Sequence, residues 1–197
     1  MSVMPGGKID RSEMWAVVVG TLPAVVAGLV FKDVIASDAR AVPAIIATTV
    51  IFGVLLGWAD HRAKRSNNAT AVVSARHALM IGLAQALALI PGTSRSGVTI
   101  TAALFLGYHP ASATRFSFLL SVPVIGGALL VMLASSTGDV GTIGLDKLIV
   151  AFAVSAVFAH VTIRGFLNLL ERVGLLPFVV YRLLLGLLLW IWLTPGL

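Results

Sequence analysis

A polar run near the middle of the chain is the feature that most constrains its fold. The run from Pro91 to Gly97 (PGTSRSG) holds an arginine, three hydroxyls and two glycines, and long apolar stretches lie on both sides of it. Irregular backbone survives at membrane depth only where protein buries it or where it lines a wet cavity, and an ionisable side chain there indicates a functional site. The run is therefore predicted to be both a break in the helices and a site.

The composition is that of an integral membrane protein. Hydrophobic residues make up 58% of the 197 residues and charged residues only 11%, whereas about a quarter of a soluble domain is charged. The net charge of +6 sits in short loops between apolar segments, so the positive-inside rule accounts for it and nucleic acid is not expected as a partner. Without cysteine, disulfides and thiolate chemistry are excluded.

Five apolar stretches have the length of about 20 residues that a membrane helix needs. All four tryptophans fall near the ends of these stretches, where amphipathic rings sit at the level of the headgroups. No linker divides the sequence, so we expect one all-α, polytopic membrane domain over residues 1–197. The predicted spans are Trp15 to Phe31, Ala41 to Trp58, Phe116 to Ala134, Lys147 to Ile163, and Leu175 to Leu193.

Residues 77–107 are predicted to form a re-entrant helical hairpin. The arm from His77 to Ile90 spans about 21 Å as a helix, against about 30 Å of hydrocarbon, and the arm from Ser96 to Gly107 is shorter. Pro91 and Gly92 stop the first arm, and the serines can cap the second. The alternative is one broken spanning helix, which would invert the orientation of everything downstream.

The loop charges favour the hairpin. The segment from Asp60 to Arg76 carries four basic residues and is expected in the cytoplasm. The loop from Ser135 to Asp146, whose charges are both acidic, then lies outside. Arg164 and Arg172 return to the cytoplasmic side, as the same rule requires.

The chemistry of the run suits a phosphate group. Arg95 can form a bidentate clamp, the glycines let backbone N–H groups approach an anion, and the next helix turns its positive dipole end toward it. The hydroxyls add donors, and either serine or a water could attack phosphorus. The alternative is that Arg95 only ties the hairpin tip to backbone carbonyls. The candidate residues around Arg95 are Gly92, Thr93, Ser94, Ser96 and Gly97.

Two further polar residues are candidates for the site. Arg182 falls near the middle of the last span, where its charge cannot easily reach water, so it is either a site residue or a buried interhelical tie. Gln85 lies six residues before Pro91 and contacts either the site or another helix. None of the eight acidic residues lies in a predicted span or near the tip, and His77 and His109 are expected at the rim.

These residues carry a resemblance to the undecaprenyl-diphosphatase (bacitracin-resistance) family. It rests on residues 84–100 around the polar run, on RFSFLL at 115–120, on Tyr181-Arg182 and on GTLPAVV at 20–26. The resemblance implies two inverted repeats with a site between two hairpin tips. It also implies a multi-pass enzyme of the bacterial inner membrane that converts undecaprenyl diphosphate to undecaprenyl phosphate, recycles this carrier for peptidoglycan synthesis and gives bacitracin resistance.

The same resemblance implies how the site works. Thr93, Ser94, Arg95 and Ser96 would bind the substrate phosphate, and we assign Arg95 and Ser94 as the catalytic candidates. It also implies a divalent cation such as Mg²⁺ or Ca²⁺. The expected partners are a polyprenyl diphosphate lipid and the membrane, and a second copy of the chain is an open alternative. The substrate-binding candidates are Gly92, Thr93, Ser96, Gly97, Arg182 and Gln85.

One departure from the family pattern qualifies this function. The family's N-terminal segment, with a glutamate-rich stretch and a Pro-x-Ser-Ser-Ser-Gly-His run, has no counterpart in this sequence. We therefore expect a misassigned or truncated gene start, and little or no hydrolysis of undecaprenyl diphosphate by the chain as given. The alternative functions are a non-catalytic lipid-phosphate binder or transporter, and a degenerate protein with no activity.

Overall fold

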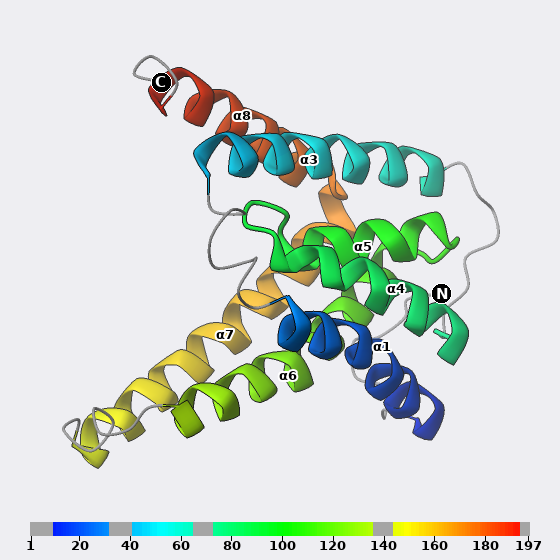
Figure 1. Ribbon diagram of the computed structural model, residues 1–197. Coiled ribbons are helices and arrows are strands. Elements are labelled where there is room, and N and C mark those ends of the chain that lie inside the picture. Colours follow the sequence, from blue (N-terminus) through cyan, green and yellow to red (C-terminus); the bar gives the residue numbers. More distant parts are fainter. Residues whose placement is uncertain (1–9, 32–40, 65–72, 136–143, 194–197) are drawn as a thin grey trace.

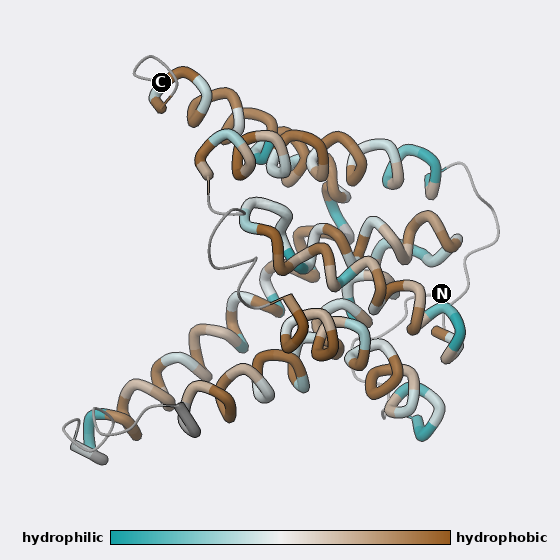
Figure 2. The backbone as a smooth tube through the Cα atoms, viewed as in Figure 1, coloured by the Kyte–Doolittle hydropathy of each residue, from teal (hydrophilic) through white to brown (hydrophobic). Residues whose placement is uncertain are grey.

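The chain is all-α wherever the structure describes it. The computed structural model describes residues 10–31, 41–64, 73–135 and 144–193. Five helices, α1, α3, α6, α7 and α8, are long and apolar enough to cross a membrane, which confirms the five predicted spans. Figure 2 shows hydrophobic residues along their shafts and hydrophilic ones mainly near their ends. The elements are α1 (Arg11–Val30), α3 (Val42–Lys64), α4 (Ala75–Ala86), the 3-10 helix η2 (Leu87–Leu89), α5 (Arg95–Phe105), α6 (Pro110–Ser135), α7 (Leu145–Val173) and α8 (Leu176–Leu193).

The helices extend beyond the spans predicted from hydropathy. The first begins at Arg11 rather than Trp15, because the Asp10 carboxylate caps it and accepts a hydrogen bond from the Arg11 N–H at 2.7 Å. Likewise α3 runs to Lys64, α6 begins at Pro110, and α7 covers residues 145–173. Hydropathy locates the part of a helix that lies in hydrocarbon, whereas caps and glycines decide where the helix ends.

The predicted re-entrant hairpin is confirmed. Helices α4 and α5 run side by side, joined by η2 and the polar tip (Figure 1). Tyr108, which follows α5, returns to the start of α4, where its hydroxyl lies 2.8 Å from His77 Nδ1 and accepts a hydrogen bond from the Ser74 N–H at 3.4 Å. Both arms therefore end on the same side of the bundle, which excludes a single broken spanning helix.

Close backbone contacts hold the hairpin between the long helices. The first arm packs on α1, where Gly82 lies directly against the backbone of Gly20. On the other side, α8 packs along α3 (Figure 1), where a Cβ on Gly53 would lie 3.3 Å from the Cβ of Arg182. Gly57 meets Val179 in the same seam. Gly53 and Gly57, four residues apart on α3, therefore permit close packing of α8.

Helices α6 and α7 extend together away from the other spans (Figure 1). No residue in the membrane-length window of α7 is buried, and its exposed side chains are largely apolar. His160 lies on this helix and is exposed, so it does not reach the bundle interior. The buried core instead gathers around the hairpin, where Ile81, Leu104, Phe116 and Leu120 are almost fully enclosed.

The contact between Gly82 and Gly20 generates a stability prediction. We expect Gly82→Ala to lower the thermal unfolding temperature in detergent, because the new methyl overlaps the α1 backbone and overpacking costs about 1–3 kcal/mol. The matched control is Gly126→Ala on α6, where a Cβ meets nothing within 4 Å. That variant gains about 0.5–1 kcal/mol of helix propensity. Equal unfolding temperatures for the two variants would contradict the packing.

Candidate functional site

The tip of the hairpin turns sharply because of one glycine. Gly92 has φ +86°, and a Cβ on it would lie 2.5 Å from the Ile45 carbonyl oxygen of α3. A side chain here would be both strained and obstructed. Glycine thus lets the tip press directly on α3.

Two threonines of α3 receive the tip. Thr48 Oγ1 donates to the Pro91 carbonyl oxygen at 2.7 Å, and Thr49 Oγ1 lies 3.3 Å from the Gly92 carbonyl oxygen. Sequence reasoning missed both residues. Two adjacent threonines in an apolar span were the available signal, because such hydroxyls often bond across membrane helices.

Ser94 begins the second arm in a strained conformation. As predicted, a serine caps the helix, and Ser94 Oγ accepts a hydrogen bond from the Gly97 N–H at 3.3 Å. Its φ of 61° is the only positive value at a non-glycine residue in the described part of the chain. Such strain costs about 1–3 kcal/mol and is concentrated at functional sites. The Ser94 side chain is also exposed, whereas Ser96 is half-buried.

Arg95 is held in place by two hydrogen bonds that leave part of its guanidinium available. Its Nε donates to Gln85 Oε1 at 3.0 Å, and one terminal nitrogen donates to the Leu120 carbonyl oxygen at 2.6 Å. Gln85 therefore contacts the site, which was one of its two predicted roles. A guanidinium has five N–H groups, so three remain on the terminal nitrogens of a half-buried side chain. This is the fork that binds a phosphate in bidentate fashion.

Arg182 has a different environment. It is 8% exposed, and its guanidinium donates to the carbonyl oxygens of Gly92 at 2.7 Å, Thr93 at 3.0 Å and Thr49 at 3.3 Å. These are the bonds of an interhelical tie, the second of the two roles predicted for this residue. With Nε also within 3.4 Å of Thr49 O, four of the five N–H groups face protein carbonyls. Direct contact with substrate stays a prediction.

The remaining predicted residues lie within the tip or behind it. Thr93 is fully buried, and its Oγ1 has no hydrogen-bond partner among the described residues; the same holds for Gln85 Nε2. Gly97 is buried at the start of α5, with Arg182 close by. Phosphate binding by Gly92, Thr93, Ser96 and Gly97 therefore stays a prediction, although the structure brings all four to the same tip.

The described residues do not form a resident metal site at the tip. No group of three His, Asp or Glu side chains comes together anywhere in the described segments. Glu13 is engaged by Arg115, with both carboxylate oxygens 2.9 Å from guanidinium nitrogens. Asp60 pairs with Lys64 at 2.7 Å, and His77 with Tyr108. Mg²⁺ and Ca²⁺ need oxygen ligands, which these side chains do not supply to the tip.

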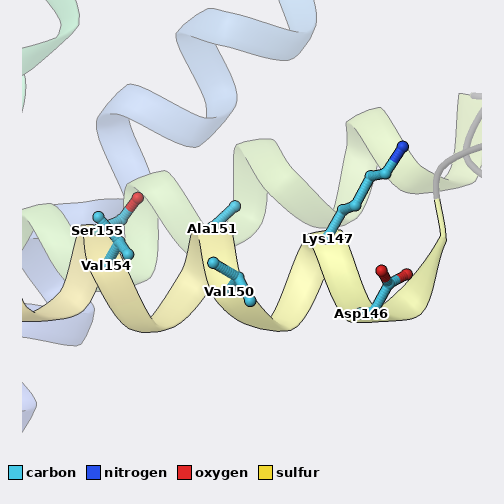
Figure 3. Close-up of a pocket in the computed structure, with 6 residues that line it drawn as sticks. All are labelled: Asp146, Lys147, Val150, Ala151, Val154 and Ser155. Carbon is cyan, nitrogen blue, oxygen red and sulfur yellow. The ribbon is translucent and has the colours of Figure 1, made fainter.

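A pocket on α7 is separate from this site. Figure 3 shows its lining residues, which come from one helix alone: the charged pair Asp146 and Lys147 at the first turn, then Val150, Ala151, Val154 and Ser155. It is a shallow feature of an exposed helix and brings no distant residues together. The chemistry-bearing side chains gather instead at the tip, where a fixed arginine fork, an exposed serine hydroxyl and a helix N-terminus favour a phosphate-bearing ligand.

Comparison with known proteins points in the same direction. The family model described as "Bacitracin resistance protein BacA" matches residues 4–188. The chain is similar to the undecaprenyl-diphosphatases of Chromohalobacter salexigens (51% identical over 180 residues) and Teredinibacter turnerae (49% over 198 residues). These matches cover 90% and 97% of this chain and 67% and 73% of the relatives. The protein of the same name from Ruthia magnifica is 42% identical over 95% of this chain.

The strained Ser94 generates a prediction about the tip. We expect Ser94→Gly to unfold at a higher temperature than Ser94→Ala, because glycine relieves a strain of about 1 kcal/mol or more and replaces an N-cap better than alanine does. Ser96 supplies the control, since it lies inside α5. There the order should reverse, because glycine is about 1 kcal/mol worse than alanine in a helix. The same order at both positions would contradict the strain.

The two arginines should differ in what they stabilise. We expect Arg182→Gln to lower the unfolding temperature more than Arg95→Gln, because it strips hydrogen bonds from three buried carbonyl groups, each worth about 0.6–2 kcal/mol within a membrane. Arg95 donates to a single carbonyl and to Gln85. Differential scanning fluorimetry in detergent compares the two variants. A larger decrease in unfolding temperature for Arg95→Gln than for Arg182→Gln would contradict the structural role assigned to Arg182.

Proposed function

The chain belongs to the bacitracin resistance protein BacA family, and we propose that it removes the terminal phosphate of undecaprenyl diphosphate. Water adds to the terminal phosphorus, the bridging P–O bond breaks, and undecaprenyl phosphate and inorganic phosphate leave. The observation that carries this assignment is Arg95, whose guanidinium is fixed by Gln85 and Leu120 yet keeps a free fork at a polar tip inside the bundle.

The tip residues divide the work in this reaction. The fork of Arg95 binds the terminal phosphate, because a planar guanidinium matches two phosphate oxygens and stabilises the charge that develops on them. Ser94 precedes Arg95 in the chain and is exposed, so its hydroxyl would meet the phosphate or its attacking water. Arg182 acts indirectly: it positions the tip by donating hydrogen bonds to the carbonyl oxygens of Gly92 and Thr93.

A divalent cation is part of the proposal through the substrate. Phosphate oxygens are good ligands for Mg²⁺ and Ca²⁺, so the cation would enter bound to the diphosphate.

The cellular role follows from the substrate. The chain is a multi-pass membrane protein, and we place it in the bacterial inner membrane. There its product would be the free monophosphate carrier used in peptidoglycan synthesis. Consuming the diphosphate, the bacitracin target, would give resistance. The lipid substrate enters from the surrounding bilayer.

A binding assay and a phosphate-release assay together test this function. We expect Arg95→Gln to weaken the binding of undecaprenyl diphosphate to the purified chain by about tenfold or more, the effect of losing a charge-assisted hydrogen-bonded contact. The control is Arg62→Gln, which removes an exposed charge at the far end of α3 and should bind like the unaltered chain. Released phosphate is measured in the same samples with Mg²⁺ present.

The outcomes separate the alternatives. Release of phosphate that Arg95→Gln abolishes supports the phosphatase. Tight, Arg95-dependent binding without release would agree with the little or no hydrolysis expected from the sequence, and would identify this chain as a lipid-phosphate binder or transporter. Equal binding by both variants would overturn the assignment of Arg95 as the phosphate ligand.

A further inference from the structure

A cavity lined in part by charged side chains lies far from the hairpin tip. It has a volume of about 500 Å³ and is formed where α3 ends, α6 begins and α7 gives way to α8. Thr49, which touches the tip, and Asp60, which lines this cavity, are eleven residues apart on α3, or about 16 Å along a helix. The cavity is therefore separate from the proposed phosphatase site.

Asp60 gives the cavity a buried acceptor. Its side chain is only 5% exposed, and one carboxylate oxygen, Oδ2, lies 2.7 Å from Lys64 Nζ. The other, Oδ1, is buried and has no hydrogen-bond partner among the described residues. An unsatisfied buried carboxylate oxygen is unfavourable by several kcal/mol unless a donor reaches it. Because Asp60 lines the cavity and Lys64 is the one partner of its carboxylate among the described residues, a ligand with a hydrogen-bond donor suits this site.

Two basic side chains give the same cavity an anion-binding wall. Lys64 is half-exposed, and its ammonium has three N–H groups, of which one serves Asp60. Arg172, on the last turn of α7, is exposed and also lines the cavity. Together they outnumber the single charge of Asp60, so the cavity favours an anion, and a phosphate group offers oxygens to both kinds of donor.

The surroundings of the cavity are apolar and face outward. Val173, which lines the cavity, is 46% exposed, and Leu169 and Leu176, which are close to the lining residues in the chain, are 46% and 59% exposed. In a membrane-spanning bundle such side chains meet acyl chains. The positive-inside rule predicts that this end lies at the cytoplasmic surface, where anionic lipids attract basic groups.

We propose that this cavity binds the headgroup of a membrane phospholipid whose headgroup carries hydroxyls. The phosphodiester contacts Lys64 and Arg172, a headgroup hydroxyl donates to the Asp60 carboxylate, and the acyl chains lie along the exposed apolar residues beside α7 and α8. A free phosphate ion satisfies the first two contacts and makes no use of the apolar flank.

Native mass spectrometry of the detergent-purified chain tests the lipid contact. Phosphatidylglycerol, which has headgroup hydroxyls, is titrated against Arg172→Gln and against Arg164→Gln, the matched control on the exposed face of the same helix. We expect the Arg172 variant to bind about tenfold more weakly, the loss of one charge-assisted hydrogen bond, while the control is unchanged. Equal affinities for the two variants would overturn the proposal.

Two further measurements identify the headgroup. The unaltered chain should prefer phosphatidylglycerol over phosphatidylmethanol, which is equally anionic but has no hydroxyl. Asp60→Leu, which has no acceptor atom, should lose that preference while still binding both. Inorganic phosphate at millimolar concentration should leave the bound lipid in place. No preference in the unaltered chain, or displacement of the lipid by inorganic phosphate, would show that the cavity holds a simple anion and would contradict the lipid assignment.

Discussion

The structure depends on one requirement, that the carbonyl groups of a non-helical tip be satisfied away from water. Pro91, Gly92 and Thr93 interrupt the helical ladder, so their carbonyl oxygens need donors from elsewhere. Arg182 supplies them from α8 and Thr48 from α3. Because these donors come from opposite parts of the sequence, the tip can form only when α3, α8 and the hairpin are packed together. The site and the fold are therefore specified by the same contacts.

The same requirement separates two arginines that look alike in the sequence. Both stand in apolar surroundings, and both are expensive to bury. Arg182 compensates for the desolvation of its charge by donating nearly all its N–H groups to carbonyl oxygens, so its role is structural. Arg95 is anchored along one part of its guanidinium and keeps the rest available. A side chain that is rigid yet incompletely satisfied is the arrangement that favours an incoming phosphate.

Local features of the sequence were enough to predict the hairpin, and packing features were not. Arm length, Pro91 and Gly92 predicted the reversal, and the serines predicted the cap, because each acts within a few residues of its own position. The partners of Arg182 depend on how α8 meets the tip, which periodicity does not encode. Asp60 was placed outside the second span because hydropathy ends at Trp58. The helix continues to Lys64 and encloses it.

Helix α3 makes polar contacts near each of its two ends, with the hairpin tip at one and the second cavity at the other. An apolar stretch lies between them. Thr48 and Thr49 serve the tip, Asp60 lines the second cavity, and the intervening side facing the bundle is built from Gly53, Leu56 and Gly57. Gly53 and Gly57 bring α8 close, and the α3 residues from Val50 to Leu56 carry no polar side chain. This stretch separates the tip contact of Thr49 from Asp60 by about 16 Å along the helix. The proposed phosphate chemistry and the proposed headgroup binding therefore lie at opposite ends of one helix, and close packing of α8 on the glycines holds those ends in a fixed relation.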